Sequence, residues 1–230
     1  MLCNLNVPLV EPEDIIPHLA KQKRHWKAGY SARELVLAWH NAPSGIPKSV
    51  RSVIESRPEF GSTELIDGFF EREVDLRTPG RNSQTDLMAV VAWGEKLGTI
   101  AVEGKVDEPF GELVLAWNDG SAGKERRLAG LCATLGIDPD RAQGLRYQLL
   151  HRAASAVYEA QRYRCHQAIM LVHSFSSAKK WFYDFADFSD SMGISVSAPN
   201  TISASKKCDG ISLNLAWVSD ECFDLRKAGA

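Results

Sequence analysis

The chain has 230 residues, of which 44% are hydrophobic and 24% charged, and its formal net charge is -2. This composition is typical of a globular protein with one domain, or one domain and an appendage. The small net charge excludes the overall basic field that marks many nucleic-acid-binding proteins, but it leaves room for a local basic patch.

The cysteines and the apolar segments predict a cytoplasmic protein. Five cysteines are scattered along the chain without a C-x-x-C pair, which favours reduced thiols and argues against a zinc site. The first residues show no basic segment followed by an apolar one, so we expect no signal peptide. No stretch approaches the ~18 consecutive apolar residues of a membrane span, and no membrane partner is expected.

The first sixty residues, 1–60, are expected to form a helical extension packed on the rest of the chain. The segment "SARELVLAWHNA" has Ser31 and Glu34 in capping-box spacing, and "PKSVRSVIESRP" predicts a second short helix bounded by prolines. Two such helices could form a helix-turn-helix. The second would offer DNA only Lys48 and Arg51, so plain helical packing is favoured.

Residues 61–230 are expected to form an α/β domain. "GSTELIDGFF" is predicted to be a helix that begins at Ser62, and "EREVDLR" an edge strand. "TDLMAVVAWG" and "GTIAVEGKV" are typical of two buried strands joined by a tight turn. A helix follows in "KERRLAGLCATLG", then the long helix "QGLRYQLLHRAASAVYEAQRY", a buried strand "HQAIMLVHSF", a helix "AKKWFYDFADFSDSMG" and a strand "GISLNLAWV". The order helix, three strands, helix, strand predicts a mixed sheet flanked by helices.

Two acids and a lysine are expected to meet at one end of this sheet. Glu103 and Lys105 are two residues apart on a strand and therefore share a face. If the two strands pair through their tight turn, Asp86 comes level with Glu103. Two carboxylates suit Mg²⁺ or Mn²⁺, which also takes substrate phosphate oxygens as ligands. A nearby lysine can activate water or neutralise charge at phosphorus.

The pattern "TD…VEGK" on adjacent strands resembles the PD-(D/E)XK nuclease superfamily, whose restriction-endonuclease-like core has the element order given above. The segments "GYSARELVLAW", "VEGKVDEPFGE" and "GLRYQLLHR" are also similar to an uncharacterised bacterial family within that superfamily. The resemblance implies metal-dependent hydrolysis of phosphodiester bonds in nucleic acid, with DNA favoured and a homodimer left open. The implied metal ligands are Asp86, Glu103, the Gly104 carbonyl and Glu64. The implied catalytic residues are Lys105, Gln148 and His151. Thr85 stands where the motif often has proline.

Each of these assignments has a structural alternative. Glu103 and Lys105 could form a salt pair on a solvent-facing sheet, and Glu64 could be an acid favoured at a helix start. Gln148 and His151 could lie on a solvated helix face, while His173 is expected to be a hydrogen-bonded core residue. Four arginines on the two amphipathic helices could contact phosphates but more commonly face water: Arg126, Arg127, Arg146 and Arg152.

Two functions therefore follow from the sequence. The first is a metal-dependent nuclease in which Asp86 and Glu103 hold Mg²⁺ and Lys105 assists the attacking water. The second is a catalytically silent protein of the same fold that binds nucleic acid or regulates.

Overall fold

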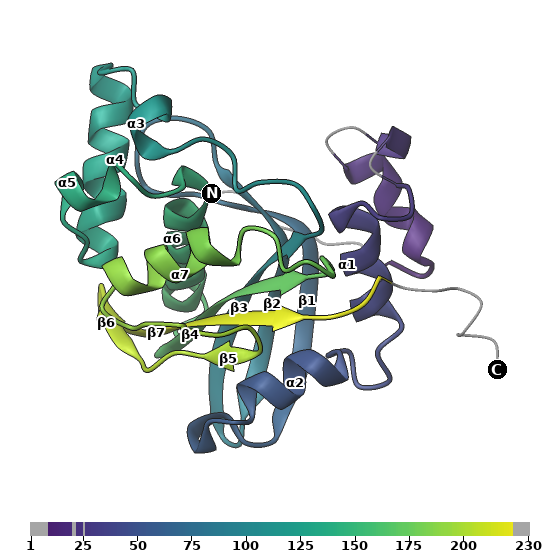
Figure 1. Ribbon diagram of the computed structural model, residues 1–230. Helices are drawn as coiled ribbons and strands as arrows, with labels where there is room; N and C mark the ends of the chain where they lie inside the picture. Colours follow the sequence, from purple (N-terminus) through teal and green to yellow (C-terminus); the bar gives the residue numbers. More distant parts are fainter. Residues whose placement is uncertain (1–8, 20–21, 25, 223–230) are drawn as a thin grey trace.

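The computed structural model describes residues 9–19, 22–24 and 26–222 as an α/β structure with a seven-stranded mixed sheet flanked by helices (Figure 1). The strands are β1 (Thr63–Val74), β2 (Ser83–Trp93), β3 (Lys96–Lys105), β4 (Gln167–Ser174), β5 (Thr201–Ile202), β6 (Lys206–Cys208) and β7 (Ile211–Ser219). The α-helices are α1 (Ser31–His40), α2 (Lys48–Ile54), α3 (Val114–Trp117), α4 (Ala122–Leu135), α5 (Pro139–Ala142), α6 (Tyr147–Arg162) and α7 (Phe182–Ser191). Three 3-10 helices precede β1: η1 (Pro12–His18), η2 (Gln22–Arg24) and η3 (Pro58–Phe60). The α/β class and the mixed sheet predicted from the sequence are confirmed.

The sheet has the order β1-β2-β3-β4-β7-β5, and β6 also pairs with β7. Strands β1, β2 and β3 are antiparallel, whereas β3, β4 and β7 are parallel to one another. Parallel neighbours need a crossover connection. Helices α3 to α6 make the crossover between β3 and β4, and α7 lies between β4 and β7.

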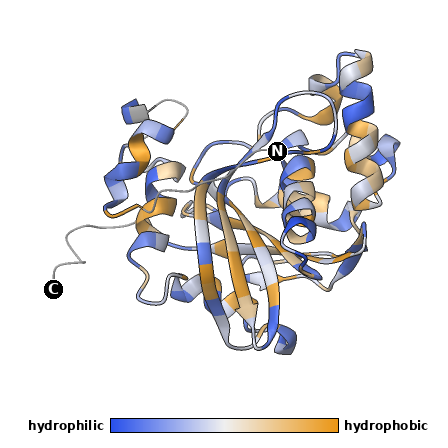
Figure 2. Ribbon diagram, turned by 180° about the vertical axis from the view of Figure 1, so that it is seen from behind, coloured by the Kyte–Doolittle hydropathy of each residue, from blue (hydrophilic) through white to orange (hydrophobic). Residues whose placement is uncertain are grey.

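Helices cover both faces of the sheet (Figure 1). One face packs against α4, α6 and α7 in a large apolar cluster that includes Met88 and Ala101. The other face packs against α1 and α2, in a cluster that includes Leu87 and Val102. Figure 2 shows the long apolar segments of the central strands from behind. Because neighbours along β3 alternate between the two clusters, Glu103 and Lys105 extend the row of Ala101 and face α6.

The predicted helix that begins at Ser62 is wrong. Residues 63–74 form the edge strand β1, which pairs with β2 from Thr63↔Trp93 to Val74↔Ser83, with an irregularity between Leu65 and Asp67. The apolar residues of this segment have helix-like spacing, but pairing along the whole length of β2 outweighs that local pattern. The three strands of the expected order are therefore β1, β2 and β3, and the helices that precede them are α1 and α2.

Most other expected elements lie where the sequence placed them, including the helices beginning at Ser31 and Lys48, strands β2, β3, β4 and β7, and helices α4, α6 and α7. Helices α1 and α2 supply buried side chains to the cluster on one face of the sheet, among them Leu35 and Ile54. No described helix is long and apolar enough to cross a membrane.

Candidate active site

The predicted meeting of Asp86 with Glu103 is confirmed. The last paired residues of β2 and β3 at this end are Leu87 and Val102, so Asp86 lies just beyond the ladder, level with Glu103. The backbone N–H of Gly104 donates to Asp86 Oδ2 at 2.9 Å. The N–H and C=O of one residue point to the same edge of an extended strand, so the Gly104 carbonyl also faces β2 and Asp86.

Glu103 and Lys105 form a buried pair on the face that α6 covers. Lys105 Nζ donates to Glu103 Oε1 at 2.8 Å, and the two side chains are only 5% and 2% exposed. Gln148 on α6 contacts both partners: its amide nitrogen donates to Glu103 at 2.7 Å, and its amide oxygen accepts from Lys105 at 3.2 Å. The alternative of a solvent-facing salt pair is therefore wrong, and Gln148 does not lie on a solvated face.

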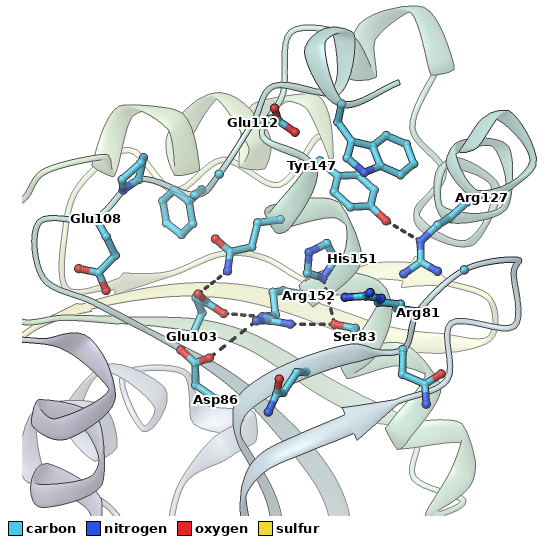
Figure 3. A pocket seen from close by; sticks show the side chains of 18 of the residues that line it. Arg81, Ser83, Asp86, Glu103, Glu108, Glu112, Arg127, Tyr147, His151 and Arg152 are labelled. Carbon is cyan, nitrogen blue, oxygen red and sulfur yellow. Dashed lines mark hydrogen bonds and ion pairs between the residues drawn. The ribbon is translucent and has the colours of Figure 1, made fainter. Parts of the chain in front are cut away.

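Arg152 completes the charge network around the two acids (Figure 3). Its Nε donates to Glu103 Oε2, its Nη1 donates to Ser83 Oγ at 2.8 Å, and its Nη2 lies 3.7 Å from Asp86 Oδ1. The residue is 6% exposed, so the expectation that this arginine faces water is wrong. Gln148 and Arg152 are four residues apart on α6, and this spacing brings both side chains to the same helix face. The spacing therefore indicated that Arg152 lies beside Gln148 at the site.

His151 lies at the edge of this network. Its Nδ1 is 3.0 Å from Ser83 Oγ, and its ring is tilted against Tyr147 with the ring centroids 5.0 Å apart. Burial lowers the pKa of His151 well below its usual value, and the charge of Arg152 lowers it further. The imidazole is therefore neutral at pH 7. It contacts Ser83 and has no hydrogen bond to Asp86, Glu103 or Lys105 among the described contacts.

The structure does not bring Glu64 to the other acids. Glu64 is an exposed residue of β1 that pairs with Ala92, near the turn end of the sheet and far along β2 from Asp86. Glu71 occupies the third acidic position instead. It lies opposite Asp86 in the β1–β2 register, between the pairs Phe70↔Leu87 and Arg72↔Thr85. Its φ of 52° is unusual for a residue other than glycine within a strand. The sequence carried no signal for this local distortion.

Burial and mutual repulsion among the acids shift the pKa values of the carboxyl groups at this end of the sheet. Burial and the Glu103 charge raise the pKa of Asp86 to about 7, and burial and the Asp86 charge raise that of Glu71 to about 8. Burial also acts to raise the pKa of Glu103, but Arg152 and Lys105 outweigh it and hold the value at about 2. Glu103 is thus firmly ionised, while Asp86 and Glu71 would lose their protons more readily beside an added cation.

These groups line a cavity of about 990 Å³. Its walls are residues 79–84, residues 108–112, the ends of β2 and β3, the first turn of α4, and one face of α6. Glu108 and Glu112 lie in the loop after β3, and both line the cavity. The Phe110 ring lies beside Lys105, whose Nζ is 5.0 Å from the ring centroid. His173, in contrast, is a core residue, as predicted: it is fully buried and accepts a hydrogen bond from Trp39 Nε1 at 3.2 Å.

The donor set fits a hard divalent cation. Mg²⁺ is commonly held by one or two carboxylates, with water and substrate oxygens completing its coordination. Asp86, Glu103 and the Gly104 carbonyl could supply such a set, in which Glu103 would share its oxygens with Lys105, Gln148 and Arg152. Within the described ranges, no group of three or more His, Cys, Asp or Glu side chains is arranged to hold a metal.

The fold and the site define a class of protein. It is an α/β protein that holds a buried pair of carboxylates, a lysine and an arginine at one end of a mixed sheet. The chain matches the family described as Domain of unknown function (DUF6946) over residues 8–222, and it belongs to that family. Neither a curated protein nor a solved structure gives a significant match.

Proposed function

We propose that the protein is a metal-dependent nuclease with a restriction-endonuclease-like core. The observation that carries the proposal is the convergence of Asp86, Glu103 and Lys105 on the wall of one cavity. Three antiparallel strands, a crossover helix and a parallel strand supply the frame of this site. The same acids and lysine, in the same strand positions, carry the resemblance to the PD-(D/E)XK superfamily.

Each residue has a definite part in the proposed reaction. Asp86, Glu103 and the Gly104 carbonyl would hold Mg²⁺ or Mn²⁺, which supplies a Lewis acid for a phosphoryl oxygen and lowers the pKa of a bound water. Lys105 is held in place by Glu103 and Gln148, so its ammonium group is pre-organised to orient the attacking water or to neutralise charge at phosphorus. Hydrolysis adds the water oxygen to phosphorus, breaks one P–O ester bond and leaves a phosphate monoester and an alcohol.

Arg152 favours a second candidate function. Its guanidinium already supplies a positive charge to Glu103 and Asp86. If this arginine takes the place of the metal, the protein would have the nuclease fold without catalytic activity. It would then act as a nucleic-acid-binding or regulatory module. In the nuclease, by contrast, Asp86 and Glu103 would hold the metal while Arg152 remains hydrogen-bonded to Glu103 and close to Asp86.

The test is cleavage of labelled DNA and RNA oligonucleotides by the purified protein with Mg²⁺ or Mn²⁺, compared with EDTA. We expect cleavage that requires the metal and is lost in Glu103→Gln, because this change removes the one acid that is firmly ionised. Glu64→Gln is the matched control, because Glu64 is exposed at the other end of β2, and it should cleave like the wild type.

Two outcomes would count against the proposal. One is a wild-type protein that leaves every oligonucleotide intact with either metal. The other is cleavage by Glu103→Gln at the wild-type rate, which would indicate a contaminating enzyme or a different site.

A further inference from the structure

Among the residues that the structure describes, Arg127 is a buried cation without an acidic partner. Three arginines of the described chain are less than a tenth exposed: Arg72 at 5%, Arg152 at 6% and Arg127 at 8%. Arg72 pairs with Glu159 at 3.1 Å, and Arg152 pairs with Glu103. Arg127 donates to two neutral groups, the Tyr147 hydroxyl at 2.5 Å from Nε and the Pro79 carbonyl at 3.1 Å from Nη1.

This lack of a counter-ion is unusual because the burial of a charge is costly unless an opposite charge or a metal compensates it. Among the described residues, no carboxylate forms an ion pair with Arg127. The two hydrogen bonds fix the direction of the guanidinium, and Nη2 has no described hydrogen bond. Arg127 lines the cavity of the carboxylate pair, so a ligand in the cavity can reach it.

The groups around Arg127 also favour an anion. Lys124 and Arg81 also line the cavity, and no described side chain caps the N-terminus of the 14-residue helix α4. Lys124 pairs with the exposed Asp119 at 2.9 Å, and Asp119 also accepts from the Ser121 N–H, so a phosphate group would compete with this carboxylate. Ser121 and Gly123 in that first turn also line the cavity, and the exposed N–H groups of a helix N-terminus favour an anion. Gly80 lies close against the guanidinium: a Cβ at this position would be 3.0 Å from Arg127 Nη1.

The cavity therefore has an acidic end and a basic end. Figure 3 shows Arg127 and Arg81 on one side of His151, and Asp86 and Glu103 on the other. Tyr147 contacts Arg127 through its hydroxyl and His151 through its ring, so it connects the two ends. An anion at the basic end would be separate from a phosphate group at the carboxylates, yet within the same cavity.

We propose that Arg127, Lys124, Arg81 and the first turn of α4 form a phosphate subsite that holds a second phosphate group of the substrate. The proposal rests on the proposed function insofar as the second phosphate belongs to nucleic acid. Guanidinium groups match phosphate oxygens in geometry as well as in charge. The phosphate could be the terminal phosphate of a strand or an internal phosphodiester, and the subsite chemistry is the same for both.

The test is isothermal titration calorimetry in EDTA, where no cleavage occurs. The probes are inorganic phosphate, a 5′-phosphorylated thymidine dinucleotide, its 3′-phosphorylated isomer and the unphosphorylated dinucleotide. We expect Arg127→Gln to weaken binding by about tenfold or more, because a charged hydrogen-bond partner is lost. Arg126→Gln is the matched control, since Arg126 is the exposed neighbour on the same helix and should bind like the wild type.

The probes separate the two sources of phosphate. Tighter binding of either terminally phosphorylated dinucleotide assigns the subsite to a strand end, whereas equal binding of all three, each weakened by Arg127→Gln, assigns it to the backbone. If Arg127→Gln does not fold, Lys124→Gln replaces it, since the Lys124 side chain is 35% exposed. If the wild type and the folded variant, Arg127→Gln or Lys124→Gln, bind these probes with equal affinity, the proposal is overturned.

The two proposals fail in distinguishable ways. Phosphate binding is measured in EDTA without turnover, so it tests the subsite independently of cleavage. Phosphate binding that depends on Arg127, in a protein without nuclease activity, would overturn only the proposed function. Metal-dependent cleavage with no effect of Arg127→Gln on phosphate binding would overturn only the subsite.

Discussion

Lys105→Ala is expected to lower the rate of metal-dependent cleavage by about 100- to 10,000-fold, the range typical of a positioned acid–base or charge-stabilising group. Lys105 Nζ is fixed by Glu103 at 2.8 Å and by Gln148 at 3.2 Å, and the Phe110 ring lies beside it. Arg152, the cation beside it, cannot take over this position, because it is held by Glu103, Asp86 and Ser83. The measurement is the single-turnover rate on an oligonucleotide at saturating enzyme.

The matched control for this prediction is Lys96→Ala. Lys96 is at the other end of β3, where it is exposed beside the turn to β2, so its loss should leave the rate unchanged. Thermal unfolding of both variants checks that Lys105→Ala is folded at the assay temperature. A Lys105→Ala protein that is folded and cleaves within twofold of the wild type would remove Lys105 from the proposed reaction.

Arg152→Met is expected to lower the free energy of unfolding by about 3–5 kcal/mol, the cost typical of removing one partner of a buried ion pair. Arg152 is 6% exposed and contacts Glu103, Asp86 and Ser83 at once. Without it, Glu103 keeps only Lys105 and Gln148, and Asp86 keeps the Gly104 N–H. Urea unfolding followed by tryptophan fluorescence measures the change.

Arg126→Met on α4 is the control for this measurement, because Arg126 is exposed and should change stability by less than about 0.5 kcal/mol. The double variant of Arg152→Met with Glu103→Gln should recover part of the loss, since it removes both charges of the pair. If Arg152→Met were as stable as the control, the buried network would not contribute to the fold.

The sequence predicted the part of the site that depends on strand periodicity. Strands β2 and β3 are runs of β-branched and apolar residues joined by a tight turn, so the antiparallel register that brings Asp86 level with Glu103 followed from counting residues. The side of the long helix that carries Gln148 was also predicted. These features depend on local spacing, and the structure retains them.

The remainder of the site depends on tertiary contacts. Arg152 is buried only because Glu103, Asp86 and Ser83 surround it, and an arginine on an amphipathic helix more commonly faces water. Glu71 reaches the site through a left-handed backbone conformation that no local pattern indicated. The sequence predicts that Glu64 lies on a helix formed by "GSTELIDGFF". That segment is an edge strand, so Glu64 lies at its far end.

The shortest strands and helices could not be predicted from the periodicity of apolar residues. Strand β5 has two residues and β6 has three, while helices α3 and α5 have four each. A stretch of this length does not complete a repeat of either pattern. Helix α3 nevertheless matters to the cavity, because it ends at Trp117, which stacks on Tyr147 with the ring centroids 3.8 Å apart.

The most direct test of the central claim, that Asp86 and Glu103 hold a catalytic metal, is anomalous diffraction from crystals soaked in Mn²⁺. The account predicts an anomalous peak between the two carboxylates in the wild type and in Glu64→Gln, and none there in Glu103→Gln. A wild-type crystal with no peak between Asp86 and Glu103, or with manganese only at another place, would contradict it. That result would favour the silent module in which Arg152 takes the place of the metal.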